Sequence, residues 1–124
     1  MNGQQIVDGS GLSRRDTISA ETVLTVLRHM HDPAGTSPFV TALPIAGVDG
    51  TLSERMRNTL AAGNVRAKTG TMSNIRSLAG YVKTRDGETL AFVAMVNNFE
   101  GAGIVANQAL DGIGVRLASF SRGR

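Results

Sequence analysis

The sequence predicts an α+β fold in which a three-stranded antiparallel meander carries a C-terminal helix and short helices precede the sheet. The hydrophobic pattern changes at Val65, where helical spacing gives way to short extended runs. Asp86-Gly87 separates the last two runs, and an Asp-Gly pair is a strong signal for a tight hairpin. Helical spacing then returns over residues 102–120. A helix that is apolar on one side buries that side best by packing across the sheet.

The length and composition fit a single domain over residues 1–124, with a helical and loop part over 1–64 and a sheet and helix part over 65–124. Hydrophobic residues make up 41% of the chain and charged residues 19%, which is too apolar for a disordered chain. A chain of this length should bury roughly two thirds of its unfolded surface. The 15 glycines indicate tight turns and close backbone approaches.

Three helices are expected before the sheet. Ser19 is a candidate N-cap, and the apolar spacing after it extends a helix to about His31. Ser37 followed by Pro38 is typical of a helix start, because proline suits the first helical position. The expected ranges are 19–31, 37–43 and a short third helix that begins at Thr51 or Ser53 and ends near Leu60.

Arg85 to Glu88 is expected to form the turn between the last two strands. Gly112 and Gly114 lower the helix propensity of the final segment, which nevertheless stays apolar along one side. The expected elements are strands at 65–71, 77–84 and 89–96 and a helix at 102–120, in chain order.

Composition excludes several classes of protein. The chain has no cysteine, which removes disulfides, thiolate chemistry and cysteine metal sites. His29 and His31 stand two residues apart, not the four of a helical zinc pair, and no metal or cofactor is expected. The formal net charge is +3, but the arginines are scattered, with one tyrosine and no tryptophan, so no nucleic-acid-binding face is expected. A mild positive field suits an anionic substrate.

The chain shows no targeting segment. Residues 1–7 lack the basic and apolar regions of a signal peptide. The longest apolar run, Leu90 to Val96, is far too short to cross a bilayer. We therefore expect neither a signal peptide nor a transmembrane segment in these residues.

The candidate site is Lys68-Thr69-Gly70, at the end of the first expected strand. The ammonium offers a point charge with three donors, and the threonine hydroxyl offers a further donor to the same anion. The glycine leaves room for a ligand backbone, so an extended peptide could pair with the strand edge. A solvated strand lysine is the alternative. A phosphate loop is excluded, because that motif needs glycine where Ala62 and Ala67 stand.

Five stretches cover most of the chain and include this triplet. They are VDGSGLSR (7–14), LPIAGVDGTLSERM (43–56), VRAKTGT (65–71), SLAGYV (77–82) and LAFVAMVNNF (90–99). Together, and in this order, they resemble the penicillin-binding D-alanyl-D-alanine carboxypeptidase/endopeptidase family of low-molecular-mass class C. The resemblance implies part of a β-lactamase/transpeptidase-like fold.

The resemblance also implies a serine acyl-transfer site for peptidoglycan stem peptides that end in D-alanyl-D-alanine. Lys68 would be the catalytic residue of this strand, assisting proton transfer and holding positive potential in the cleft. Thr69 and Thr71 would bind the terminal carboxylate of the substrate, and Gly70 would give clearance. The backbone N–H of Thr71 would donate to the oxyanion. Arg76, just past the motif, is a candidate cleft residue.

Two further motifs of that family, Ser-x-x-Lys with the nucleophile and Ser-x-Asn, do not occur in the sequence. We therefore expect the C-terminal portion of a catalytic domain, which is inactive alone because a serine without a base is a weak nucleophile. Stem peptides and β-lactams would react only when the N-terminal part is present. The resemblance implies a periplasmic or cell-envelope location.

Two alternatives stay open. One is a non-catalytic module from a truncated paralogue that binds peptide ends or partner proteins. The other is a relative of the serine β-lactamases, which share the strand motif, although VDGSGLSR and AGVDGTL favour the carboxypeptidases. Without the helical half that would carry the nucleophile, sheet surface stays exposed, and self-association through it is expected.

Overall fold

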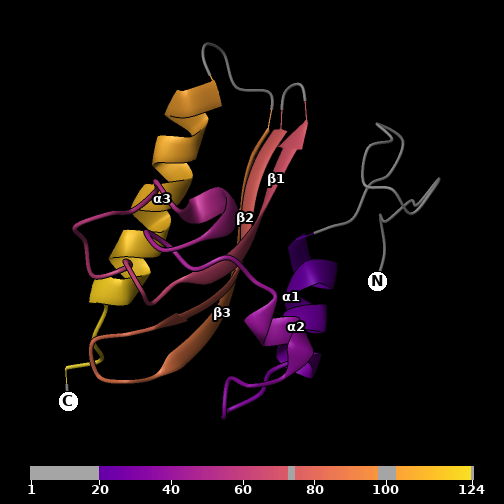
Figure 1. The fold of residues 1–124 in the computed structure, drawn as a ribbon, viewed down its shortest axis with the longest axis vertical. Coiled ribbons are helices and arrows are strands. Elements are labelled where there is room, and N and C mark those ends of the chain that lie inside the picture. Colours follow the sequence, from indigo (N-terminus) through magenta and orange to yellow (C-terminus); the bar gives the residue numbers. More distant parts are fainter. Residues whose placement is uncertain (1–19, 73–74, 98–102, 124) are drawn as a thin grey trace.

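A computed structural model of the chain describes residues 20–72, 75–97 and 103–123. The expected cap at Ser19 and the stretch 7–14 lie outside these described residues. Three antiparallel strands form a meander sheet in the order β1-β2-β3, with helices on both faces (Figure 1). The predicted α+β fold is therefore confirmed. The elements are α1 (Ala20–His29), α2 (Pro38–Thr41), η1 (Gly50–Leu52), β1 (Arg66–Met72), β2 (Ile75–Lys83), β3 (Thr89–Asn97) and α3 (Gly103–Ser119).

The sheet is buried on both faces, because alternate residues of β2 pack against different helices. Leu78 and Val82 join Leu110 of α3 in the larger core, on one face. Tyr81 joins Leu27 of α1 on the other face, in a smaller core. The result is three layers, with α3 on one side of the sheet and α1 and α2 on the other (Figure 1).

Tyr81 ties α1 to the sheet through its hydroxyl as well as its ring. The hydroxyl donates a hydrogen bond to the carbonyl oxygen of Leu27, near the end of α1. Burial raises the pKa of the Tyr81 phenol, so the group stays a protonated donor at neutral pH. This hydrogen bond links the C-terminal part of α1 to β2.

Helix α3 buries one stripe of small and apolar residues against the sheet. Ala106, Leu110, Gly114 and Ala118 recur every fourth residue, which places them on one face. A Cβ on Gly114 would lie 3.0 Å from the Met56 sulfur, so this glycine lets the helix approach the loop below it. Outside this stripe, α3 exposes Ile104, Val105 and Ile113. Self-association through exposed apolar surface stays a prediction.

The predicted third helix, from Thr51 or Ser53 to Leu60, is wrong. The segment forms only the single 3-10 turn of η1, followed by turns. Met56 and Asn58 have φ angles of 58° and 62°, in the left-handed region that an α-helix does not use.

Arg55 holds the 53–60 segment against α3. Its guanidinium donates to both carboxylate oxygens of Asp111, at 2.7 to 3.2 Å, and the pair is largely shielded from solvent. Leu52 is fully buried in the larger core. These two anchors belong to the non-helical path of the segment, and packing of this kind commonly overrides local helix propensity.

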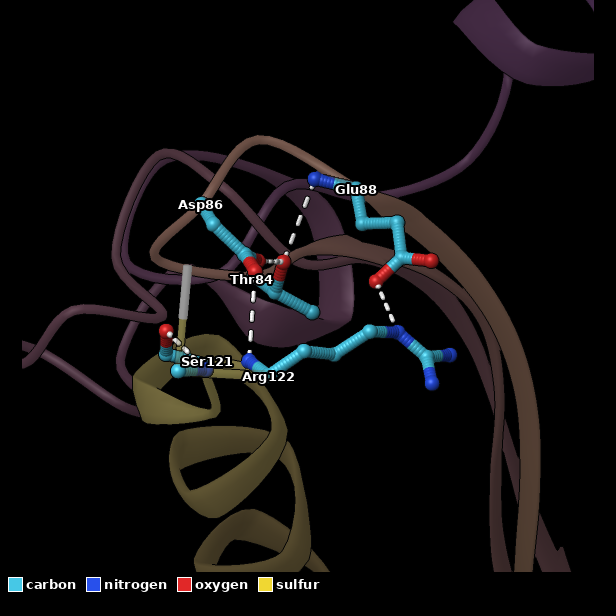
Figure 2. A network of polar contacts seen from close by, with 6 residues as sticks. Thr84, Asp86, Glu88, Ser121 and Arg122 are labelled. Carbon is cyan, nitrogen blue, oxygen red and sulfur yellow. Dashed lines mark hydrogen bonds and ion pairs between the residues drawn. The ribbon is translucent and has the colours of Figure 1, made fainter.

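A polar network fastens the end of the chain to the β2–β3 hairpin (Figure 2). The Thr84 hydroxyl donates to Asp86 and accepts from the backbone N–H of Glu88 at 3.1 Å. Arg122 donates its backbone N–H to Asp86 at 3.2 Å and its Nε to Glu88 at 2.6 Å. The network closes the predicted Asp-Gly turn, in which Gly87 has a φ of 83°.

Asp32 organises the loop between α1 and α2. Its carboxylate accepts backbone N–H bonds from Ala34, Thr36 and Ser37, at 2.8 to 3.2 Å. The bonds from Thr36 and then Ser37 contribute most to holding the pKa of Asp32 below its ordinary value of 3.8. The carboxylate is therefore ionised at neutral pH, and its charge is shared among three donors.

This loop is expected to loosen in acid. Because the pKa of folded Asp32 is depressed, its stabilising effect is complete above pH 3.8 and is lost as the pH falls through the lower folded value. NMR amide shifts of Thr36 and Ser37 should titrate with a midpoint below 3.8. Asp32→Asn should remove that titration. A midpoint at or above 3.8 would contradict the assignment.

Candidate active-site wall

Lys68 stands in the middle of β1 and opposite Ala79, which places it on the face of the sheet that carries α1 and α2. Its side chain is exposed, and its Nζ donates to the carbonyl oxygen of the next residue, Thr69, at 2.7 Å. This bond draws the ammonium to the outer edge of the strand, where Thr69 directs its backbone groups. The positive charge therefore lies at the edge and faces solvent.

A cavity of about 590 Å³ lies between this face of the sheet and the two short helices. Lys68, Thr69 and Ser77 contribute polar groups to its wall. The rest of the wall is mostly apolar, and it includes Val26 from α1, Phe39 and Leu43 from the α2 region, and Val93 and Met95 from β3. The cavity thus combines an apolar surface with a cation at one side.

Described residues cover the outer edge of β1 at its start, and none of them pairs with it beyond. The N–H of Ala46 donates to Val65 at 2.9 Å, and the N–H of Ala67 donates to Pro44 at 3.0 Å. Along a β-strand, the backbone groups of alternate residues point to the same side. Thr69 and Thr71 therefore direct their N–H and C=O groups to this edge, past the point where the 44–46 segment ends.

Thr69 directs its side chain to the other face of the sheet, because it pairs with Leu78 of the larger core. Its hydroxyl lies 3.1 Å from the hydroxyl of Thr51 in η1. Lys68 and Thr69 were expected to offer two donors to one anion, but their side chains lie on opposite faces of the sheet. A ligand at the edge of the strand is placed to contact both groups.

Gly70 has no side chain, and the space that this leaves is filled by the side chain of Ser77. Gly70 pairs with Ser77 of β2, and a Cβ on Gly70 would collide with the Ser77 hydroxyl. Ser77 in turn lines the cavity. The glycine therefore lets the neighbouring strand present a hydroxyl beside Lys68.

Arg76 lies on the face opposite the cavity. It pairs with Thr71, and its guanidinium reaches so close to Gly103 that a Cβ there would collide with it. Gly103 begins α3, so Arg76 covers the start of that helix. Its role as a cleft residue stays a prediction, and this placement favours a structural role.

Sequence reasoning missed Thr51 and Ser77 as neighbours of the motif. Both lie inside stretches that the family resemblance covers, at 43–56 and 77–82, but only strand register and tertiary contact bring them to Thr69 and Gly70. The described residues hold no cluster of three or more metal-ligating side chains. Within the same residues, no helix has the length and apolar character needed to cross a membrane.

Among solved structures, this layered sheet with its Lys-Thr-Gly edge strand is similar to the penicillin-binding proteins. The crystal structure of penicillin binding protein 4 from Haemophilus influenzae superimposes with a TM-score of 0.77 and 30% identity. The match covers 96% of this chain and 28% of that one. A predatory endopeptidase from Bdellovibrio bacteriovorus shares the fold, with a TM-score of 0.65 at 19% identity.

The family of the chain is shown by its sequence. The pattern of the D-Ala-D-Ala carboxypeptidase 3 (S13) family matches residues 1–118, and the chain belongs to this family. It is 43% identical to a D-alanyl-D-alanine carboxypeptidase from Actinomadura sp. over 124 residues, which is 96% of this chain and 22% of that protein. Carboxypeptidase DacB of Mycolicibacterium smegmatis is 38% identical over 98% of this chain and 27% of its own length. The chain thus spans about a quarter of these relatives.

Proposed function

We propose that this chain forms one wall of the substrate cleft of a serine-type D-Ala-D-Ala carboxypeptidase and contributes no nucleophile to it. The observation that carries the proposal is the open edge of β1 at Thr69 and Thr71, with the Lys68 ammonium beside it. No described residue pairs with this part of the edge, so an extended peptide can do so, and the cation lies where a carboxylate or a developing oxyanion would be stabilised.

The chemistry of the wall follows from the strand. A stem peptide that pairs with the edge of β1 would set its scissile carbonyl near the N–H of Thr71, which points outward. One such donor in acyl-transfer enzymes contributes about 2.7–4 kcal/mol to transition-state stabilisation. Lys68 would release the Thr69 carbonyl and turn to the substrate, where its charge favours the carboxylate terminus and the proton transfers of acylation.

The proposed partners are stem peptides ending in D-alanyl-D-alanine and β-lactams, which would acylate the serine of the complete site. The structure of the Haemophilus influenzae protein bound to a β-lactam, at a TM-score of 0.79 and 30% identity, supports the second partner. Membership of a family of D-Ala-D-Ala carboxypeptidases supports a location in the cell envelope. The match to a family of carboxypeptidases, with 43% identity to one of them, favours the carboxypeptidase over the non-catalytic binding module.

A chimera tests the proposal. Residues 1–124 replace the matching stretch of the Actinomadura carboxypeptidase, to which they are 43% identical. We expect the folded chimera to be labelled by a fluorescent penicillin and to release D-alanine from a D-Ala-D-Ala peptide. The isolated chain should take up no label, because its sequence has no Ser-x-x-Lys. A folded chimera without labelling would favour the non-catalytic module, and stable stoichiometric labelling of the isolated chain would overturn the missing-nucleophile assignment.

A further inference from the structure

A second cavity, of about 350 Å³, lies at the other end of the α1–sheet interface. The loop that follows α1 forms one wall, and the end of the sheet near the β2–β3 hairpin forms the other. Val40 of α2 lines this cavity, whereas Phe39 and Leu43 line the Lys68 cavity, so α2 separates the two. The second cavity is thus a distinct place on the same face of the sheet.

Three basic side chains line this cavity. Arg66 pairs with Tyr81 across β1 and β2, and Lys83 lies two residues farther along β2 on the same face. Diagonal neighbours of this kind have Cβ atoms about 7–8 Å apart, a separation that two long cationic side chains can close around one group. His31 joins them from the loop, with its ring centroid 5.9 Å from that of Tyr81.

The charges of Arg66 and Lys83 have no counter-ion within the described part of the chain. No described residue forms an ion pair or a hydrogen bond with the guanidinium of Arg66 or the ammonium of Lys83. Asp32 is the single carboxylate in the lining, and its two oxygens already accept three backbone N–H groups. The nearby Tyr81 hydroxyl is bonded to Leu27. The guanidinium of Arg66 and the ammonium of Lys83 therefore face the cavity beside a carboxylate that is already bonded to three backbone donors.

We propose that this cavity binds an oxyanion, a phosphate group held between Arg66 and Lys83. Guanidinium groups bind phosphate through two parallel N–H bonds, and an ammonium adds a point charge. The ring of Tyr81 and the side chain of Val40 give the site an apolar floor against which a carbon substituent on the phosphate can rest. The site is separate from the Lys68 wall and does not depend on acyl transfer.

Phosphate binding to the chain is measured by NMR, with inorganic phosphate as the probe and sodium chloride at matched ionic strength as the reference. We expect saturable shifts of the backbone amides of Arg66, Tyr81 and Lys83 with phosphate and none with chloride. The double variant Arg66→Gln/Lys83→Gln should raise the dissociation constant at least tenfold. Arg57→Gln is the control, because Arg57 is an exposed arginine outside the cavity, and it should bind as the parent does.

A second arm distinguishes the source of the phosphate. Dimethyl phosphate stands for the diester of a polymer, and equal binding of it would assign the site to a phosphodiester chain, whereas binding of inorganic phosphate alone would assign it to the free ion. Lys68→Ala should leave phosphate binding intact, which keeps this outcome independent of the proposed carboxypeptidase function. Linear shifts without saturation, or unchanged affinity in the folded double variant, would overturn the proposal.

Discussion

Replacing Gly80 with alanine is expected to break the pairing of β1 with β2 and to lower the free energy of unfolding by about 3 kcal/mol or more. Gly80 lies opposite Ala67, and a Cβ at this position would lie 2.6 Å from the Ala67 Cα and collide with the Arg66 carbonyl oxygen. These atoms are backbone, so no side-chain rotation relieves the contact. The strand that carries Lys68 would have to move away from the sheet.

Urea unfolding of the variant and the parent measures this loss. Gly112→Ala is the matched control, because a Cβ on Gly112 meets nothing within 4 Å and the residue lies inside α3. That change should raise stability by about 0.5–1 kcal/mol, since alanine is the better helix former. Equal stabilities for Gly80→Ala and the parent would show that the two strands are not packed as described.

The second large effect is expected from Lys68→Ala in the chimera with the Actinomadura carboxypeptidase. Positioned groups that assist proton transfer contribute about 10²–10⁴-fold to a rate. We expect the acylation rate constant with fluorescent penicillin to fall at least about a hundredfold. The fold should survive, because the Lys68 side chain is exposed and its hydrogen bond among the described residues is to a backbone carbonyl.

Arg57→Ala serves as the control for charge alone. Arg57 is a basic residue that pairs with Glu54 on an exposed surface, and it lies in neither cavity wall. Its removal should leave acylation within about twofold of the parent chimera, since exposed ion pairs have small energetic effects. An acylation rate for Lys68→Ala within threefold of the parent would remove Lys68 from the catalytic machinery and leave β1 as a structural strand.

Local patterns in the sequence predicted most of the secondary structure. The spacing after Val65 and the Asp86-Gly87 pair led to three strands that the structure places at 66–72, 75–83 and 89–97. Ser37 caps α2, as the Ser-Pro pair indicates, with its hydroxyl accepting from the N–H of Val40 at 3.3 Å. These features depend on neighbours within a few residues, so periodicity and turn chemistry suffice to find them.

The segment 53–60 shows where such reasoning ends. The sequence of this segment has helical spacing, but the segment does not form a helix. Its Arg55 forms an ion pair with Asp111, which lies 56 residues farther along the chain. The residues around the Lys-Thr-Gly motif could not be predicted for the same reason, since Thr51 contacts Thr69 from 18 residues away. No local sequence pattern encodes such long-range contacts. They follow from the register of the strands and the packing of the layers.

The sequence by itself determined the class of fold, the position of the Lys68-Thr69-Gly70 triplet on a strand and the family in which that strand is used. Each of these depends on residue order along the chain. Only the tertiary structure decided which face each side chain takes, that Ser77 fills the space beside Gly70, and that the edge of β1 opens after Ala67. Burial and hydrogen-bond satisfaction act between segments far apart in sequence, and they alone select among the arrangements that local propensity allows.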